Sequence, residues 1–296
     1  MASPQLYYED KIPSTWAQIW NHFRARPSAY IGLWALGLML ALSLVGPWLA
    51  PFSAVEQASQ TLLAPPSWDA NGDVKYFFGT DALGRDIWSR LLHGAHLTFG
   101  YAALIVLVTV IVGFMIGTLS GTARGLRASI LGHLLDALLS LPSVVLALLV
   151  VAVLGQGLNH IFWAVGLALL PSIVRTVHNA VHEESQKEYV IAAKLDGANR
   201  YQLLRYAIWP NIVDTMVVRT TLTFSAAILD IAALGFLNLG AQAPVPEWGA
   251  MVRDGVANVL SAPWTVAMPG IAILLAVLAT NLVGDGLRHA ITEERD

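Results

Sequence analysis

Long apolar runs recur along the chain, and shorter polar segments separate them. A helix of about 20 mainly apolar residues is long enough to cross the hydrocarbon core of a bilayer. Six runs meet this rule, over residues 29–49, 96–120, 130–154, 160–173 with an extension to 180, 212–239 and 263–283. Pro171 and Arg175 interrupt the fourth run. The pattern therefore predicts an all-α, polytopic membrane protein with six transmembrane helices.

One polar segment stands apart from this pattern, the stretch EYVIAAKLDGANRYQLLRYAIWPN over residues 188–211. Its apolar residues recur at helical spacing among charged ones, which predicts two short amphipathic helices. Asp196-Gly197 is a turn signal, so we expect Gly197 to adopt a positive φ at the bend and Asn199 to lie on a solvated face. Pro210 lacks an N–H and suits the first turn of the following span. Such an element either docks on another protein or lies on lipid headgroups as a connector.

Composition agrees with a membrane location. Of 296 residues, 56% are hydrophobic and 12% are charged, whereas soluble domains carry roughly 25% charged residues. The net charge is -3, and the basic residues form no continuous stripe, which argues against nucleic acid as a partner. The chain has no cysteine, so disulfides and thiol chemistry are excluded. Glu9 and Asp10 precede the first apolar run, which is too long for a cleaved signal, so we interpret that run as an anchor.

Basic residues near the spans predict the orientation, because Lys and Arg are retained on the cytoplasmic side of a membrane. Both termini are then cytoplasmic, with most of the flanking basic residues on that side. The cytoplasmic set is Lys11, Arg24, Arg26, Arg124, Arg127, Arg175, Lys187, Lys194, Arg200, Arg205, Arg288 and Arg295, and the outer set is Lys75, Arg85, Arg90 and Arg253.

Two outer segments contain candidate contact residues. Residues 78–95 carry an apolar stripe, with Thr80 or Asp81 as a helix cap and Asp86 and Arg90 as an i,i+4 pair, which predicts an amphipathic helix. We expect this helix to pack over the spans, with direct substrate contact as the alternative. In residues 240–255, three side chains either dock a substrate-delivery protein or are solvated loop residues: Glu247, Trp248 and Arg253.

Ionisable residues inside a span are costly in hydrocarbon, and they tend to face a bundle interior or an aqueous path. Asp230 lies deep in the fifth predicted span, where it lines a translocation path or bonds a neighbouring helix. Asp136 and Arg219 lie near the cytoplasmic ends of their spans and are expected to serve helix packing. Pro142 removes a backbone hydrogen bond and is expected to kink the third span.

Several activities lack the residues that they require. A nucleotide-binding P-loop needs G-K-[ST], which does not occur, so the chain itself is expected neither to bind nor to hydrolyse ATP. An intramembrane serine protease needs a base beside Ser120, yet the last span has no histidine. His178 and His182 share helical spacing without a clear third ligand, so we predict no metal site. An ion-driven secondary transporter is the remaining alternative, and Asp230 alone supports it.

Residues 191–211 resemble the EAA loop of permeases from ATP-binding-cassette (ABC) importers. That signature reads acidic-Ala-Ala, three residues, Gly, nine residues, then Ile-x-Leu-Pro. The matching positions are Ala192, Ala193, Gly197 and Pro210, and the departures from it are Ile191, Ala207 and Trp209.

Four further segments resemble the permeases of dipeptide, oligopeptide and nickel importers. They are FGTDALGRDIWSRLLHGA (78–95), LLSLPSVVLALLVVAVLG (138–155), AILDIAALGFLNLGAQAPVPEWGAM (227–251) and NLVGDGLRHAI (281–291). Within that branch, HEESQKEYVIAAKLDGA, LDIAALGFLNLGAQ and APWTVAMPG are most similar to permeases of Sap antimicrobial-peptide transporters. The resemblance implies a type I importer permease fold in an inner membrane and a peptide as substrate. Nickel, haem and polyamines stay open as alternative substrates.

In this family the EAA loop is a coupling helix that seats in a cleft of an ATPase subunit. The resemblance therefore implies that eight residues couple this chain to an ATPase, namely Glu188, Tyr189, Ala192, Ala193, Lys194, Asp196, Gly197 and Ala198. It also implies three kinds of partner: a second homologous permease, two cytoplasmic ATPase subunits that hold ATP and Mg, and a periplasmic solute-binding protein. No cofactor is expected in the chain itself.

These expectations divide the chain into five parts. They are a cytoplasmic tail over 1–28, a first anchor helix over 29–49, a periplasmic loop with an amphipathic helix over 50–95, a core of five spans over 96–286, and a cytoplasmic tail over 287–296. The core includes residues 185–211, which we call the coupling loop.

Overall fold

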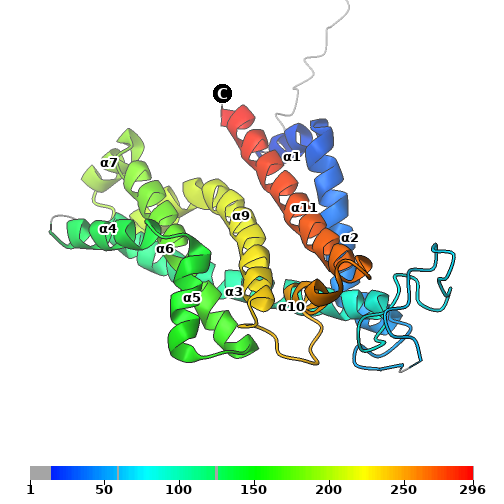
Figure 1. The fold of residues 1–296 in the computed structure, drawn as a ribbon. Helices are drawn as coiled ribbons and strands as arrows, with labels where there is room; N and C mark the ends of the chain where they lie inside the picture. The colour runs from blue at the N-terminus through cyan, green and yellow to red at the C-terminus, as the bar shows by residue number, and fades with distance from the viewer. Residues whose placement is uncertain (1–14, 59, 124–125, 296) are drawn as a thin grey trace, which may run out of the picture.

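The computed structural model describes residues 15–58, 60–123 and 126–295. Within these ranges the chain forms helices and no β-strand (Figure 1), which confirms the predicted all-α class. The first 14 residues of the predicted N-terminal tail, including Lys11, lie outside the described residues, and so does Arg124.

The helices begin and end close to the apolar runs. In chain order they are α1 (Thr15–Ala25), α2 (Pro27–Leu49), α3 (Ile87–Gly121), α4 (Leu126–Leu139), α5 (Ser143–Leu154), α6 (Leu158–Glu184), α7 (Glu188–Leu195), α8 (Arg200–Gln202), a π-helical turn (Leu203–Ile208), α9 (Trp209–Phe236), α10 (Trp248–Gly255), a short 3₁₀ turn (Val256–Asn258) and α11 (Trp264–Arg295).

Five of these helical segments are long and apolar enough to cross a membrane. They are α2, α3, α6, the segment from Arg200 to Phe236 and α11, and the described residues contain a sixth span if α4 and α5 are counted together. Helix α6 continues through Pro171 to Glu184, which covers the predicted extension to residue 180.

The third predicted span is broken and not merely kinked. Its two halves meet at an angle of 94°. Pro142 stands before α5 with φ -57° and ψ 144°, outside the helical region. A proline lacks the N–H that would continue the ladder, and it also pushes the preceding residue out of the helical conformation. The effect of Pro142 therefore exceeds the predicted kink, and α4 projects from the rest of the molecule (Figure 1).

The outer amphipathic segment forms the first turns of α3, and its cap differs from the predicted one. Asp86 caps the helix by accepting a 2.8 Å hydrogen bond from the Ser89 N–H. Thr80 and Asp81 serve the preceding loop instead: the Thr80 hydroxyl accepts from the Ala64 N–H at 2.8 Å. Both residues predicted as caps are thus engaged elsewhere, and the helix begins six residues later than Asp81.

Helices α3 and α6 pack closely because glycines on α3 leave room for branched side chains on α6. Gly113, Gly117 and Gly121 recur every four residues and face Ile173, Val177 and Val181, respectively. A Cβ atom at Gly117 would lie 2.5 Å from the Val177 Cβ. This arrangement is the small-xxx-small packing common between membrane helices.

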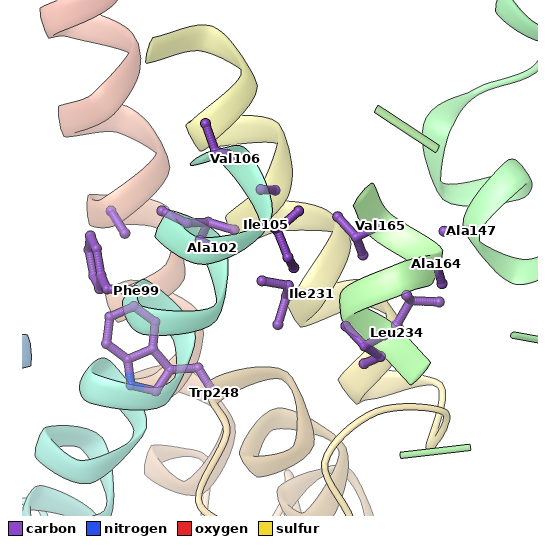
Figure 2. Close-up of a cluster of buried hydrophobic side chains, with 14 of the residues drawn as sticks. Phe99, Ala102, Ile105, Val106, Ala147, Ala164, Val165, Ile231, Leu234 and Trp248 are labelled. Carbon is purple, nitrogen blue, oxygen red and sulfur yellow. The ribbon is translucent and has the colours of Figure 1, made fainter. Parts of the chain in front are cut away.

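The main apolar core lies where α3, α5, α6, α9 and α10 meet (Figure 2). Its buried side chains include Phe99, Ile105, Val165, Ile231, Leu234 and Trp248. This core connects the helices of the central bundle and holds α10 against them.

The two ends of the molecule differ in content (Figure 1). One end contains α1, the C-terminal part of α11 and α7, while α10 and the long loop before α3 lie at the other. Helix α1 is held against α11 by buried Ile19 and Phe23, and Arg26 donates a 2.7 Å hydrogen bond to Glu293.

Candidate functional site

The coupling loop folds as two helical pieces joined at a glycine. Helix α7 ends in a Schellman motif, in which the Ala198 N–H donates to the Ala193 carbonyl at 3.0 Å and the Gly197 N–H donates to the Lys194 carbonyl at 3.2 Å. Gly197 has a φ of 90°, so the predicted positive φ at the bend is confirmed. Space is open around this glycine, since a Cβ there would meet nothing within 4 Å. The constraint on Gly197 within this chain is therefore its backbone conformation.

Asn199 has a structural role that differs from the expected one. Its side chain accepts a 2.9 Å hydrogen bond from the Gln202 N–H, and the Gln202 side chain accepts a 2.8 Å bond from the Asn199 N–H. This is a reciprocal capping box at the start of α8. Asn199 is exposed, but removing its side chain would cost about 1 kcal/mol of helix stability. The predicted solvated position is confirmed, and the three-residue spacing to Gln202 adds a capping role that was not predicted.

The loop returns to the bundle through the π-helical turn and α9. Pro210 is in the first turn of α9, as predicted. Its missing N–H interrupts the regular ladder at the same place as the π-helical turn. The Asn211 amide donates to the Ala207 carbonyl at 2.7 Å. A side chain thus supports the backbone where the helix departs from regular geometry.

Side-chain hydrogen bonds attach the loop to the ends of α6 and α3 and connect its two helical pieces. The Tyr189 hydroxyl contacts Glu184 at the end of α6, and it also lies 3.1 Å from the Ala207 carbonyl. Arg200 donates to the hydroxyl of Thr122, directly after α3. These bonds place the loop where the ends of α3 and α6 and the start of α9 come together.

The outward face of α7 is apolar at its tip. Leu195 is 83% exposed, whereas Val190 on the opposite face is buried. Among the predicted coupling residues, the exposed ones are Glu188, Tyr189, Ala192, Lys194, Asp196 and Gly197, and the partly buried ones are Ala193 and Ala198. Leu195 was not among the predicted site residues, because helical spacing alone does not tell an exposed leucine from a core one.

A cavity of about 650 Å³ lies beside the loop. It opens between the end of α3, the end of α6 and α7, and its polar lining includes Thr122, His182, Gln186, Lys194 and Arg200. The cavity therefore leaves unfilled space between α7 and the ends of the spans.

On the opposite end, Glu247 and Trp248 are buried, which corrects the prediction that they contact a docking protein. Glu247 caps α10: its carboxylate accepts from the N–H groups of Gly249 at 2.8 Å and Ala250 at 2.9 Å. Burial raises the pKa of Glu247 to about 7. The Trp248 indole donates to the Leu91 carbonyl at 3.0 Å. With exposures of 1% and 3%, both side chains hold α10 against the bundle.

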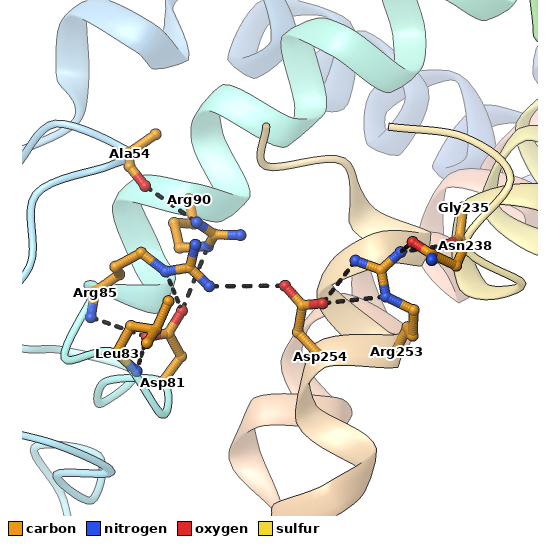
Figure 3. Close-up of polar contacts among 9 residues, drawn as sticks. All are labelled: Ala54, Asp81, Leu83, Arg85, Arg90, Gly235, Asn238, Arg253 and Asp254. Atoms are coloured by element: carbon orange, nitrogen blue, oxygen red, sulfur yellow. Dashed lines mark hydrogen bonds and ion pairs between the residues drawn. The ribbon is translucent and has the colours of Figure 1, made fainter. Parts of the chain in front are cut away.

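Arg253 is part of a chain of ionic contacts that joins α10 to the outer loop (Figure 3). It contacts Asp254 at 2.7 Å, and Asp254 lies 3.6 Å from Arg85. Arg85 in turn contacts Asp81 at 2.6 Å, and Arg90 lies 3.7 Å from the same carboxylate. Arg90 therefore pairs with Asp81 and not with Asp86 as predicted, because Asp86 is used as the helix cap.

The ionisable residues predicted inside the spans differ in their surroundings. Asp230 on α9 is buried, and its Oδ2 has no hydrogen-bond partner among the described residues. Asp136 on α4 pairs with Arg175 on α6 at 3.2 Å. The Asp136–Arg175 pair connects α4, the first half of the broken α4–α5 segment, to α6.

Comparisons with known proteins agree with these features. A family model for the binding-protein-dependent transport system inner membrane component matches residues 110–293, and one for the N-terminal TM domain of oligopeptide transport permease C matches residues 14–66. The chain is 48% identical to the peptide transport system permease protein SapC of Escherichia coli O6:H1 (strain CFT073), over 98% of both chains. It is 42% identical to the dipeptide transport system permease protein DppC of Escherichia coli (strain K12), over 95% of this chain and 94% of that one.

A solved structure shares the fold. A chain from inward facing conformations of the MetNI methionine ABC transporter aligns with a TM-score of 0.57 and 18% identity, over 69% of this chain and 97% of that chain. The family match covers more than half of the sequence, and the similarity to SapC extends over nearly all of it. The chain therefore belongs to the binding-protein-dependent transport permeases and, among them, to the peptide permeases of ABC transporters.

Proposed function

We propose that this permease lies in the inner membrane and that its coupling loop transmits movement from partner ATPase subunits to the spans. The observation that carries the proposal is the apolar outward face of α7, where Leu195 is 83% exposed. An exposed leucine at the tip of a helix whose Tyr189 contacts the end of α6 and the start of α9 suits a groove on another protein. The alternative is a connector whose apolar face lies on lipid headgroups.

The remaining partners follow from the family. A second homologous permease completes the pathway, two ATPase subunits hold ATP and Mg, and a periplasmic solute-binding protein delivers the substrate. We propose Arg253 as part of that outer contact, because its side chain is 23% exposed at the outer end of the ionic chain. Closure of the ATPases moves the coupling loop, and the spans rock to switch access from one side to the other.

The substrate is a peptide in this proposal, because the relatives above are named as peptide and dipeptide permeases. Nickel complexes, haem and polyamines are the alternatives. ATP turnover belongs to the partners, so the isolated chain is expected to show none.

Leu195→Arg tests the docking proposal. A charged side chain at the tip of α7 would be buried without a partner in the groove of the ATPase, which is strongly unfavourable. We expect ATPase subunits to be lost when the variant transporter is purified, together with peptide uptake, while the permease still inserts in the membrane. Gly197→Val, which places a β-branched side chain at φ 90°, is expected to reduce uptake as well.

The matched control is Leu260→Arg, at the other end of the molecule, where the leucine is 100% exposed. It should retain ATPase subunits at the level of the unmodified transporter. Full co-purification with Leu195→Arg would favour the headgroup connector.

A further inference from the structure

We propose that the Tyr189 side chain transmits movement of α7 to both α6 and α9. This inference rests on the proposed function of the coupling loop. Tyr189 was expected to contact an ATPase as one of a set of coupling residues. Its hydroxyl instead lies within hydrogen-bonding distance of Glu184 at the end of α6 and of Asn211 on α9, although the residue is 45% exposed. We therefore assign it as a positioning residue within the permease.

Three groups meet at the Tyr189 hydroxyl. Glu184, in the last turn of α6, and the Ala207 carbonyl, in the π-helical turn before α9, both lie within hydrogen-bonding distance as acceptors. The Asn211 side-chain amide donates to the hydroxyl at 3.0 Å. A tyrosine hydroxyl has one proton and can accept as well, so it can serve all three groups by sharing its proton between the two acceptors.

The surroundings keep this proton on the tyrosine. Partial desolvation of this half-exposed side chain, together with Glu184, raises the pKa of Tyr189 to about 12. Glu184 is itself buried, and Lys187 pairs with it at 2.8 Å. A hydrogen bond to a charged acceptor is stronger than one between neutral groups. The bond from α7 to α6 is thus of the stronger kind.

The bond to the Ala207 carbonyl reaches the π-helical turn, where the α-helical bonding pattern is interrupted. A π-helical turn commonly marks a functional position, because its backbone bonding departs from the α-helical ladder. Pro210 and the π-helical turn lie side by side in the sequence, and Asn211 reaches the same carbonyl at 2.7 Å. The Tyr189 hydroxyl therefore connects α7 to the one π-helical segment of the described chain.

A purely structural reading is that Tyr189 only anchors α7. The two readings differ in what they predict for a transporter that still assembles. Loss of an anchor lowers the amount of intact complex, and it lowers ATP hydrolysis and peptide uptake together. If Tyr189 transmits movement, loss of its hydroxyl leaves ATP hydrolysis intact in the assembled complex. It reduces only the amount of peptide transported per ATP hydrolysed.

The test is Tyr189→Phe in the complete transporter reconstituted in vesicles, with peptide uptake and ATP hydrolysis measured in parallel. The change removes the hydroxyl and keeps the ring. We expect ATPase subunits to co-purify normally and uptake per ATP to fall roughly tenfold, the effect of a hydrogen bond to a charged group. Asn211→Leu, which removes the other side chain at the Ala207 carbonyl, should reduce the ratio in the same direction.

Two exposed tyrosines of the same loop are matched controls. Tyr201 and Tyr206 are 62% and 73% exposed, and Tyr201→Phe and Tyr206→Phe should leave the ratio unchanged. An unchanged ratio in Tyr189→Phe, or an equal fall in the control variants, would overturn the assignment. Failure of the docking proposal is separate, because it would appear as normal ATPase co-purification with Leu195→Arg.

Discussion

Glu247 is an acidic side chain that the fold encloses at the start of α10. Its pKa rises from 4.5 to about 7 because burial disfavours the carboxylate. Between these two pH values the folded protein binds more protons at Glu247 than the unfolded chain does. The contribution of Glu247 to stability is therefore fully present below about pH 4.5, and it is lost as the pH rises through about 7.

We expect the unfolding temperature of the purified permease in detergent to fall, relative to that of Glu247→Gln, between pH 5 and 8. The amide does not titrate, so the difference between the two proteins isolates Glu247. A shift of this size corresponds to a change in unfolding free energy on the order of 3 kcal/mol. Thermal unfolding curves across this pH range measure it, and parallel pH profiles for the two proteins would contradict the assignment.

At the scale of secondary-structure elements, the close packing of α3 on α6 depends on glycines. Gly117 faces Val177 at a distance that leaves no room for a Cβ atom. Gly100, on the same helix, has nothing within 4 Å of its Cβ position. The two glycines thus share a helix but differ in their surroundings, which allows intrinsic helix propensity to be separated from packing.

Gly117→Ala is expected to destabilise the permease by about 1–3 kcal/mol, because the added methyl group forces the two helices apart. Gly100→Ala should be neutral or slightly stabilising, since alanine is the better helix former. Thermal unfolding of both variants in detergent checks the contrast. Equal effects of the two substitutions would show that α3 and α6 do not depend on this contact.

At the scale of the whole molecule, the coupling loop, α1 and the C-terminal part of α11 lie at one end (Figure 1). The distribution of basic residues predicts that this end is cytoplasmic. Since the chain has no cysteine, single cysteines report on each side without background.

We expect a cysteine at Asp69 to react with an impermeant thiol reagent added outside, and one at Lys194 to react only after the inner face is opened. Both positions are exposed. A cysteine at Glu247 is unsuitable because the site is buried. Labelling of the Lys194 variant from outside, in intact cells, would reverse the proposed orientation.

Local features of the molecule could be predicted from the amino-acid sequence. The apolar runs predicted the spans, and the Asp196-Gly197 pair predicted the bend with a positive φ at Gly197. Pro210 predicted the start of α9. The helix-capping role of Asn199 could have been predicted as well, because the spacing from Asn199 to Gln202 is that of a capping box. These properties depend on residues within a few positions of one another, so short sequence patterns determine them.

Other features were decided only by the tertiary structure. Trp248 is bonded to Leu91, which is 157 residues away, and its burial could not be read from a loop that contains Pro and Gly. Tyr189 meets Asn211 across 22 residues, and Asp136 on α4 pairs with Arg175 on α6. The hydrophobic pattern by itself determined the number and approximate positions of the apolar spans, although not the 94° break between α4 and α5. Which side chains meet, and which are left exposed for a partner, depended on how the helices pack, because packing brings distant residues together.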